Sequence, residues 1–432
     1  MKKRILITVD HKWRDLPDRA YLAEILSTKH NFKVYLARDG DEVKYWRAFK
    51  PNVVVVNHIL EIHKRNWIKN LPQEVKVVIL PTEGITAYTK DMVNILGGDR
   101  EEYKLVRALL SWVDFLEDYW SSDCFLPKER IYPVGVPRFD FFFSPEKRII
   151  FKKPEYLRKK MKLGQNTKII TFFLNFVYAT AASRNIELWR KILIRQGYDP
   201  KLHIEMAYKD LEAREKFIIT IQEVIEHFPN YIFLIKPHPN EDFLFYKKRI
   251  KKHPHIRFIP NLYSIEALLI SDLIIQRRCT TGLESAILDI PAIDYNYELP
   301  DLYNGDLVEG IWPEATSKEE LLDLITKWEK GDLNPWFECK EERKRRIEKW
   351  CGFNKGKAIE KAAEIISKIA EEADYYHLDL FQIIKDKVRY YFVSSLKDVY
   401  RKIFPDRWGR YSKAPNFLDF WQWRRKIKIL NA

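Results

Sequence analysis

The sequence predicts an α/β fold with two Rossmann-like domains, each built around a parallel sheet, followed by a helical extension. Three observations lead to this prediction. Short apolar segments of strand length alternate with helical segments over residues 4–140, and the alternation begins again at residue 168. Polar residues follow the ends of several predicted strands. From residue 317 onward the pattern is helical.

The size and composition of the chain fit this architecture. Its 432 residues are too many for one ordinary core, so at least two domains are expected. Hydrophobic residues make up 46% and charged residues 31%, which is typical of a folded chain. The apolar runs, such as VVVV at 53–56, are far shorter than the ~18 residues of a membrane span. The opening MKKRILITVD predicts a strand rather than a signal peptide, because its short apolar run ends at Asp10.

The first half alternates strands and helices. Strands are expected at 4–10, 32–37, 52–57, 75–80, 112–116 and near residue 131, and helices at 20–28, 41–49, 64–70 and 101–111. Such βαβ units have right-handed crossovers, so the strands are parallel and their carboxyl ends meet at one edge of the sheet. That edge carries DHKWRD at 10–15, Asn57 with His58, and PTEG at 81–84. These polar residues are expected to converge on one cleft.

The second half repeats the pattern. Strands are expected at 168–176, 231–235, 256–259, 272–276 and 291–295, with the last one closing the sheet, and helices at 186–196, 209–227, 264–270 and 283–288. The segment VYATAASRN, at 177–185, predicts a loop that covers a site. Later helices are expected from a cap at Ser317, at 338–350 and at 356–372. The predicted organisation is a first domain at 1–148, a linker at 149–166, a second domain at 167–332, helices that pack back at 333–375, and a tail at 376–432.

The segment IFLIKPHPNE, at 232–241, is the centre of the functional prediction. A buried strand runs into Lys236-Pro237-His238-Pro239, and the two prolines exclude both a helix and a continued strand. Ligands of open α/β sheets bind at such carboxyl ends. Lys236 and His238 on a stiff turn suit a phosphate-bearing ligand. The alternative is a solvated lysine and a histidine that caps the turn.

A second candidate lies one strand–helix unit later. Arg277-Arg278-Cys279-Thr280-Thr281-Gly282 places two hydroxyl groups and a glycine before a helix, where backbone N–H groups and the helix dipole favour an anion. Glu284, on the first turn, would accept a hydrogen bond from a ribose or base. The alternative is that Thr280 or Thr281 caps the helix. A nucleotide-sugar donor with one or two phosphates would bridge this segment and the Lys236 turn.

Other chemistries are disfavoured. The chain has no GxGxxG after its first strand and no GxxxxGK[ST], which argues against dinucleotide redox chemistry and a P-loop NTPase. The second half has no DxD pair to hold a divalent ion, so we expect a metal-independent transfer in which Lys236, His238 and the Arg277/Arg278 pair compensate the phosphate charge. The scattered cysteines, Cys124, Cys279, Cys339 and Cys351, argue against a zinc site or disulfides and favour a reducing cytoplasm.

The first half is expected to handle the acceptor. Transfer to a hydroxyl needs a general base or a nucleophilic carboxylate. Glu83 is the first choice, followed by Asp10 and Asp15, with Arg14 beside them; Asp10 is alternatively structural and bonded to Arg14, and Glu83 alternatively caps a helix. Arg138 either meets an anionic substrate or forms a structural ion pair. His11, His58 and His203 have no assigned role.

The net charge of +14 is concentrated in the tail. From Lys385 onward, 13 Lys or Arg stand against 4 Asp, which gives +9 and leaves +5 for the rest of the chain. The tail is also aromatic and predicts either a peripheral anchor on an anionic membrane or a helix packed on the first domain. We expect the packed part to end near residue 375 and the anchor to lie beyond it. Nucleic acid is disfavoured because the body has no accompanying basic motif.

Taken together, these segments resemble the bacterial surface carbohydrate biosynthesis family, a relative of capsule Kdo transferases, polysialyltransferases and CDP-glycerol glycerophosphotransferases. The resemblance covers roughly residues 1–370. It is carried by VDHKWRDLPDRAYLAEIL at 9–26, LPTEG at 80–84, GVPRFD at 135–140, KPHP at 236–239 and RRCTTGLESAILDIPAI at 277–293. It implies a GT-B fold, in which two Rossmann-like domains face each other across a cleft.

The resemblance also implies roles for particular residues. In the related sialyl- and Kdo-type enzymes, an HP motif and a paired hydroxyl motif hold the phosphate of a CMP-activated sugar. His238-Pro239 and Thr280-Thr281 match these motifs, although polysialyltransferases have Ser-Ser at the second. The implied function is a cytoplasmic glycosyltransferase, either free or peripheral on the inner membrane face. It would use a CMP- or CDP-linked sugar and a glycan or glycolipid acceptor to build capsule or lipopolysaccharide, without a further cofactor. The alternatives are a CDP-glycerol-type glycerophosphotransferase, a nucleotide-sugar epimerase and a non-catalytic membrane-recruited component.

Overall fold

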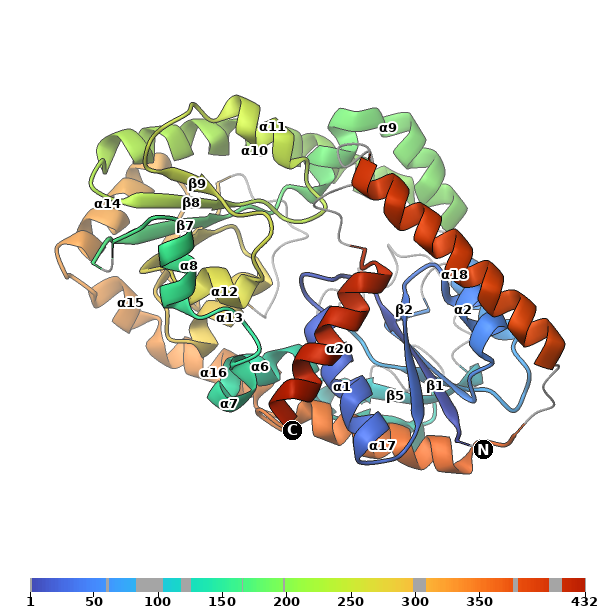
Figure 1. The fold of residues 1–432 in the computed structure, drawn as a ribbon. Coiled ribbons are helices and arrows are strands. Elements are labelled where there is room, and N and C mark those ends of the chain that lie inside the picture. The colour runs from blue at the N-terminus through green and yellow to red at the C-terminus, as the bar shows by residue number, and fades with distance from the viewer. Residues whose placement is uncertain are drawn as a thin grey trace. The chain divides into compact units, whose positions relative to one another are not determined.

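The computed structural model describes residues 2–59, 62–82, 104–117, 126–164, 166–196, 199–297, 308–375, 380–403 and 414–431. The chain divides into two compact units (Figure 1). Unit 1 comprises Met1–Asp140, Arg195–Tyr198 and Phe353–Ala432, and unit 2 comprises Phe141–Ile194 and Asp199–Gly352. The C-terminal helices therefore belong to the unit that also contains the N-terminus.

Unit 1 contains a six-stranded parallel sheet with the order β2-β1-β3-β4-β5-β6. Its strands are β1 (Arg4–Val9), β2 (Lys33–Arg38), β3 (Val53–Val56), β4 (Lys76–Ile79), β5 (Val106–Ser111) and β6 (Ile131–Pro133). The connections contain α1 (Leu16–Thr28), α2 (Glu42–Phe49) and α3 (Ile62–Lys69), and the short 3-10 turns η2 (Asp114–Leu116), η3 (Lys128–Arg130) and η4 (Pro137–Phe139). Every residue of β3 is buried, as expected for a parallel strand covered on both faces.

One expected helix of unit 1 is a strand. The sequence pattern predicts a helix over 101–111 and a strand over 112–116, but the strand is Val106–Ser111. It fills the position between β4 and β6, where Leu109 pairs with Ile131. Periodicity alone does not distinguish a short buried helix from a short buried strand, and here the pairing with two neighbours decides between them.

Unit 2 contains a second six-stranded parallel sheet, ordered β12-β11-β10-β7-β8-β9. Its strands are β7 (Ile169–Phe173), β8 (Ile232–Lys236), β9 (Ile256–Phe258), β10 (Leu273–Gln276), β11 (Ala292–Tyr295) and β12 (Glu314–Ala315). The strand expected to close the sheet is therefore not at its edge, because the two-residue β12 pairs beyond it. So short a strand carries too little apolar pattern to be recognised from sequence.

The remaining helices up to residue 351 belong wholly or mainly to unit 2, and several of them cover the two faces of its sheet (Figure 1). They are α6 (Asp140–Phe143), α7 (Pro145–Arg148), α8 (Pro154–Lys160), α9 (Val177–Gln196), α10 (Pro200–His227), α11 (Phe243–Arg249), α12 (Ser264–Leu268), α13 (Thr280–Ile287), α14 (Lys318–Glu329), α15 (Asn334–Glu338) and α16 (Lys340–Cys351). The segment 177–185, predicted as a loop, is helical and bends at Asn185. The predicted cap of α14 is confirmed, since the Ser317 hydroxyl accepts a hydrogen bond from the Glu320 N–H at 3.2 Å.

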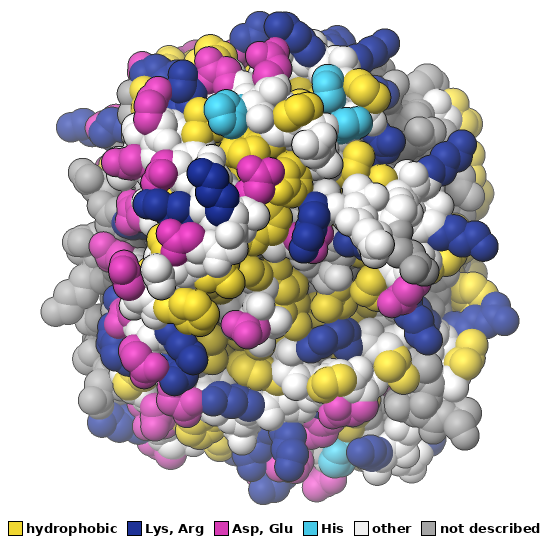
Figure 2. Space-filling view, turned by 90° about the vertical axis from the view of Figure 1, so that its left-hand side faces the viewer, with side chains coloured by type: hydrophobic (Ala, Val, Ile, Leu, Met, Phe, Trp, Pro, Cys, Tyr) yellow, Lys and Arg dark blue, Asp and Glu magenta, His cyan; other side chains and the backbone are white. Residues whose placement is uncertain are grey.

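The C-terminal extension packs on unit 1 through α17 (Ala358–Glu372), α18 (Leu380–Ile403) and α20 (Phe417–Asn431). The helices α17 and α20 contact α1, and α18 contacts α2. Packing does not end near residue 375 as expected, because Phe420 and Ile427 of α20 are buried. None of the helices in the described ranges is long and apolar enough to cross a membrane. On the face shown in Figure 2, basic and acidic side chains are interspersed.

Candidate functional site

The turn after β8 is held by a buried carboxylate. Oε1 of Glu241 accepts hydrogen bonds from the backbone N–H of Phe176, at 2.8 Å, and of His238, at 3.4 Å. Its other oxygen accepts from the hydroxyl of Tyr246. Burial raises the pKa of Glu241 to about 7, although these hydrogen bonds oppose the shift. Glu241 thus fixes the KPHP segment against the segment that follows β7.

His238 is oriented by the same turn. Its Nδ1 accepts a hydrogen bond from the Asn240 backbone N–H at 3.2 Å. A neutral imidazole with Nδ1 as acceptor carries its proton on Nε2, so His238 presents a donor through that atom. The ring is partly exposed. An N–H group at Nε2 is of the kind that can donate to a phosphate oxygen.

Lys236, the last residue of β8, is a buried cation with only 6% of its surface exposed. Within the described residues it has neither a hydrogen bond from its ammonium group nor an ion pair within 4 Å. Burial lowers its pKa to about 8, while the more distant carboxylates of Glu284 and Glu266 oppose the shift. An ammonium group kept in this setting favours a site that an anion completes.

The hydroxyl pair lies within the helix rather than before it. The helix α13 begins at Thr280, three residues earlier than expected, and Cys279 is its N-cap residue. Thr280 and Thr281 therefore occupy the first turn, where backbone N–H groups lack helical acceptors. A Cβ at Gly282 would lie 2.8 Å from Nε2 of Gln276, so the glycine lets this first turn approach the end of β10.

The two arginines before this helix are both engaged. The guanidinium of Arg277 is buried and forms an ion pair with Asp210 at 2.8 Å. The Arg278 backbone N–H donates to Asp294 at 2.7 Å, and its guanidinium lies 3.2 Å from Glu314. Its φ of 38° belongs to the left-handed region, which turns the chain sharply out of β10. Both arginines thus have carboxylate partners within the protein, and their part in donor binding stays a prediction.

The sheet order brings the two candidate segments together. The strands β8 and β10 both pair with β7, one on each side, and all three are parallel. Lys236 and Thr280 therefore follow strands that lie two apart, roughly 10 Å from strand to strand. Such a span fits one or two phosphate groups between an ammonium group and the start of a helix. The expectation that the segments share one edge is confirmed by this topology.

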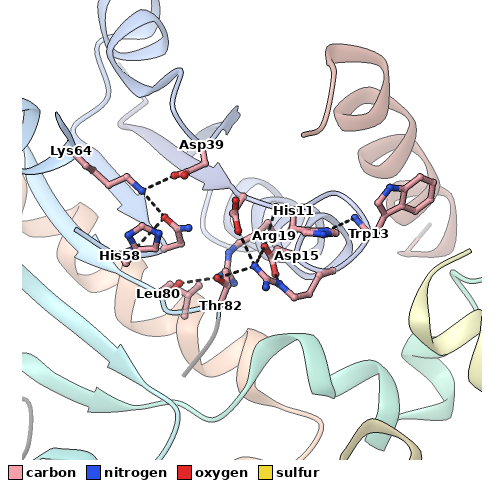
Figure 3. Close-up of polar contacts among 12 residues, drawn as sticks. His11, Trp13, Asp15, Arg19, Asp39, His58, Lys64, Leu80 and Thr82 are labelled. Atoms are coloured by element: carbon pink, nitrogen blue, oxygen red, sulfur yellow. Dashed lines mark hydrogen bonds and ion pairs between the residues drawn. The ribbon is translucent and has the colours of Figure 1, made fainter. Parts of the chain in front are cut away.

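The polar edge of unit 1 differs in its electrostatics (Figure 3). The Arg14 guanidinium contacts Asp15 at 2.5 Å and Asp10 at 3.0 Å, and donates to the hydroxyl of Thr82 at 3.3 Å. Asp15 also accepts from the His11 backbone N–H at 3.1 Å. Burial opposes the charge of Arg14, but Asp15 and then Asp10 outweigh it and raise the Arg14 pKa. Asp10 is thus bonded to Arg14, the structural alternative considered from the sequence.

A second cluster at this edge was not foreseen. Lys64 of α3 is buried, and its Nζ donates to Asp39 at 2.8 Å and to Asn57 at 3.0 Å (Figure 3). Burial raises the pKa of the neighbouring Glu42 carboxyl, and the charge of Asp39 adds to this effect. Lys64 carried no signal in the sequence, because it stands within a basic helix that predicts solvent exposure.

The GVPRFD segment is structural in several positions. Asp140 accepts from the backbone N–H groups of Ala358 and Ile359, at 3.0 and 2.9 Å, and so caps α17. Gly135 has a φ of 90°, and a Cβ there would collide with the carbonyl oxygen of Phe353. Arg138 is buried, with its guanidinium 4.7 Å from the Phe139 ring centroid. Asp140 thus has a structural role as a cap of α17, and the role of Arg138 stays a prediction.

Some predictions lie outside the described residues, and other features were missed. Glu83, the first choice for the catalytic carboxylate, is one of the residues not described, so its role stays a prediction. Sequence reasoning did not single out Glu241, although an acidic residue directly after a proline-stiffened turn is a recognisable signal. His11 lies beside the Arg14 cluster, and its Nδ1 accepts from the Trp13 N–H at 3.2 Å. Within the described part of the chain, no three His, Cys, Asp or Glu residues form a group suited to a metal ion.

The comparison with known proteins supports the architecture. No family model matches the sequence, and no curated protein does. Solved structures do match, among them the wall teichoic acid polymerase TagF, with a TM-score of 0.56, 14% identity, and coverage of 86% of this chain and 89% of TagF. UDP-GlcNAc 2-epimerase from Neisseria meningitidis, bound to UDP-GlcNAc, matches with a TM-score of 0.51 and 14% identity over 85% of this chain and 100% of the epimerase.

A third similar structure is S. aureus MnaA with UDP, which has a TM-score of 0.52 and 12% identity over 85% of this chain and 97% of MnaA. At these identities the likeness shows the fold alone. It confirms the predicted fold class, a GT-B-like α/β protein with two parallel-sheet domains and a C-terminal helical extension.

Proposed function

We propose that this protein is a metal-independent GT-B glycosyltransferase that uses a CMP- or CDP-linked sugar to build a cell-surface polysaccharide. The observation that carries the proposal is Lys236, a buried ammonium group without an ion-pair partner among the described residues. It ends the strand β8 at the same sheet edge as the first turn of α13. A donor phosphate between them would supply the missing negative charge.

In the proposed reaction, an acceptor hydroxyl oxygen attacks the anomeric carbon of the donor sugar. The bond from that carbon to the phosphate oxygen breaks, and CMP or CDP leaves with the electron pair. Lys236, His238 and the N–H groups of Thr280 and Thr281 stabilise the developing phosphate charge. Glu83 accepts the acceptor's proton, with Asp10 as the second choice. Glu284 binds the nucleoside.

Thermal unfolding in the presence of nucleotides tests the donor assignment. CMP or CDP is expected to raise the unfolding temperature, because a ligand that binds only the folded state stabilises it. The shift should persist in EDTA, since the proposed charge compensation is made by protein groups. If neither cytidine nucleotide produces a shift while UDP does, the cytidine assignment fails; if no nucleotide does, the donor site itself is refuted.

The likeness to TagF favours one alternative, a glycerophosphotransferase. In that reaction an acceptor oxygen attacks phosphorus, and the product keeps a phosphodiester. Mass spectrometry of the product distinguishes the two, because a glycosyltransferase product gains a sugar without phosphorus. The likeness to the epimerases favours another alternative, which predicts an altered nucleotide sugar in the absence of any acceptor.

A peripheral position on an anionic membrane belongs to the same proposal. The outer side of α18 carries a row of apolar residues with 53–80% of their surface exposed, spaced three or four apart: Phe381, Ile384, Val388, Phe392, Leu396, Val399 and Ile403. Lys385, Arg389 and Lys397 flank this row. Such a helix suits a lipid interface with negative charge. Co-sedimentation is expected with vesicles containing phosphatidylglycerol and not with phosphatidylcholine alone.

A further inference from the structure

Unit 1 contains a cavity of about 420 Å³ between β2 and the helices α2, α18 and α20. It lies within the size range of small-molecule sites. Its walls are mainly aromatic: β2 and α2 supply Tyr35, Tyr45 and Phe49, and α18 and α20 supply Tyr390, Tyr391 and Phe417. All of these residues lie outside the proposed donor and acceptor sites.

The aromatic walls are built on packed side chains. Tyr45, Phe49 and Tyr390 are buried. The ring centroids of Tyr45 and Tyr390 lie 4.6 Å apart, and those of Tyr35 and Phe49 lie 4.2 Å apart. Rings that pack on one another have little freedom to collapse, so the cavity is pre-formed.

Arg424 contributes to fixing the helix α20 over this cavity. Arg424 donates to the Val34 carbonyl oxygen at 2.8 Å and to the Ser27 hydroxyl at 2.9 Å, and lies 3.6 Å from Glu24. Its charge is thus used to hold α20 against β2 and α1. The position of the remaining basic residues of α20 follows from this attachment.

Two further cations line the same cavity. Arg425 and Lys428 are exposed, and neither forms an ion pair within the ranges that the structure describes. Lys387 of α18 adds a third positive charge, 5.8 Å from the Phe49 ring centroid. Burial lowers the pKa of Lys387, and the nearby charges of Lys33 and Arg4 lower it further. The cavity therefore combines an apolar interior with an excess of positive charge.

This combination identifies the chemistry of a ligand. An aromatic interior with cations at its border complements a molecule that has a hydrocarbon chain and a negatively charged end. The helix α18 supplies Tyr390 and Tyr391 to the wall of the cavity. Its outer side carries the exposed apolar row suited to a lipid interface, where such molecules are available.

We propose that this cavity binds the hydrocarbon chain of a long-chain phosphate, with the phosphate group at Arg425 and Lys428. The site goes beyond the proposed transferase activity and uses none of the residues assigned to the donor. A failure of nucleotide binding would therefore not contradict this site. A failure of long-chain phosphate binding would likewise not contradict the proposed donor site.

Calorimetric titration of the full chain with decyl phosphate, below its micelle concentration, tests the proposal. Binding is expected with a negative heat-capacity change, because the chain leaves water for an apolar cavity. Decanol and inorganic phosphate, which each supply half of the ligand, are expected to bind at least tenfold more weakly. Arg425→Glu and Lys428→Glu should each weaken decyl phosphate binding about tenfold, since a cation is replaced by an anion.

Lys426→Glu is the matched control, because Lys426 stands on the same helix but lies over the Trp423 ring and does not line the cavity. It should change the affinity less than twofold. The proposal is overturned if decyl phosphate does not bind, if decanol binds as well, or if Lys426→Glu weakens binding as much as Lys428→Glu. All three substitutions are at exposed positions, so the variants are expected to fold.

A competition experiment then distinguishes two sources of the same chemistry. Vesicles containing phosphatidylglycerol that displace decyl phosphate would assign the site to a membrane phospholipid. Decyl phosphate binding that such vesicles do not affect would assign it to a single-chain phosphate. Displacement by pure phosphatidylcholine vesicles to the same extent would contradict a role for the anionic group and so refute the proposal.

Discussion

The polar sheet edges of the two units differ in how their cations are compensated. In unit 1, Arg14 contacts Asp10 and Asp15, and Lys64 contacts Asp39 at 2.8 Å. In unit 2, Lys236 is similarly buried at the end of a strand, yet among the described residues it has no ion pair within 4 Å. The pKa of Lys236 is lowered to about 8, whereas the pKa of Arg14 is raised.

This difference separates two roles that look alike in the sequence. A compensated cluster is stable by itself and presents little net charge to a ligand. A buried and uncompensated ammonium group lowers the stability of the free protein, and such groups are found at sites where binding supplies the compensation. The edge of unit 2 is therefore the stronger candidate for an anionic donor, and that of unit 1 for a neutral acceptor.

The largest expected effect comes from Lys236→Met. The variant should bind CDP about 100-fold more weakly, since loss of a desolvated charge contact removes several kcal/mol. It should also be more stable at pH 7. The pKa of Lys236 lies below its ordinary value of 10.5, so this amine binds a proton less tightly in the folded state than in the unfolded state. The resulting loss of folding stability is complete below pH 8. The free energy of unfolding should rise by on the order of 2 kcal/mol, measured by urea denaturation.

Lys168→Met is the matched control, because Lys168 is an exposed lysine of the same unit that pairs with Asp272 at 3.3 Å. It should leave both CDP affinity and stability nearly unchanged. A Lys236→Met variant that binds CDP normally would contradict the assigned role of the lysine. A variant that loses both binding and stability would show that the lysine is structural.

The second prediction concerns the compensated edge. Asp15→Ala removes one of the two carboxylate partners of Arg14 and the acceptor of the His11 N–H, so the free energy of unfolding should fall by about 2 kcal/mol. CDP affinity should not change, because Asp15 belongs to unit 1. Urea denaturation and calorimetry measure the two quantities. Asp323→Ala, at an exposed ion pair, is the control that should cost under 0.5 kcal/mol. Loss of CDP binding in Asp15→Ala would remove the distinction between the two edges.

Much of the fold follows from the sequence because its strands are short apolar runs with polar residues at their ends. The prediction was wrong at 106–111, where a strand takes the place of a helix, and at 177–185, where a helix takes the place of a loop. In both cases local pattern was ambiguous and packing decided. The two residues of β12 carry no pattern at all, so only the complete sheet reveals them.

The sequence predicted that the two candidate donor segments share one sheet edge, but not how their charges are balanced. Proline spacing and the alternation of strands and helices predict that Lys236, His238 and Thr280 lie at one edge of the sheet. Which cations are neutralised depends on partners far along the chain, such as Asp210 for Arg277, 67 residues away. No spacing rule gives such pairs. For the same reason, Lys64 could not be recognised as buried until the fold was known.

The smallest expected effect tests the support of the KPHP turn. Glu241→Gln keeps an acceptor for the N–H groups of Phe176 and His238 but removes a titrating group. Burial raises the pKa of Glu241 to about 7, so the folded wild type binds a proton more tightly and loses stability as pH rises from 4.5 through 7. The variant should lack this pH-dependent loss. Its free energy of unfolding relative to wild type should therefore rise by about 1 kcal/mol from pH 5 to pH 8.

Urea denaturation at the two pH values measures this difference, and CDP affinity should fall no more than about threefold because the turn keeps its backbone contacts. Asp18→Asn provides the counterpart in unit 1, where burial raises the pKa of Asp18 to about 7. Asp18→Asn should reduce the pH dependence of the free energy of unfolding while leaving CDP affinity unchanged. A Glu241→Gln variant with the wild-type pH profile would show that Glu241 is ionised throughout. An ionised Glu241 carboxylate would then hold the turn. The positive charge of Lys236 would be more nearly compensated than the contrast between the two edges requires.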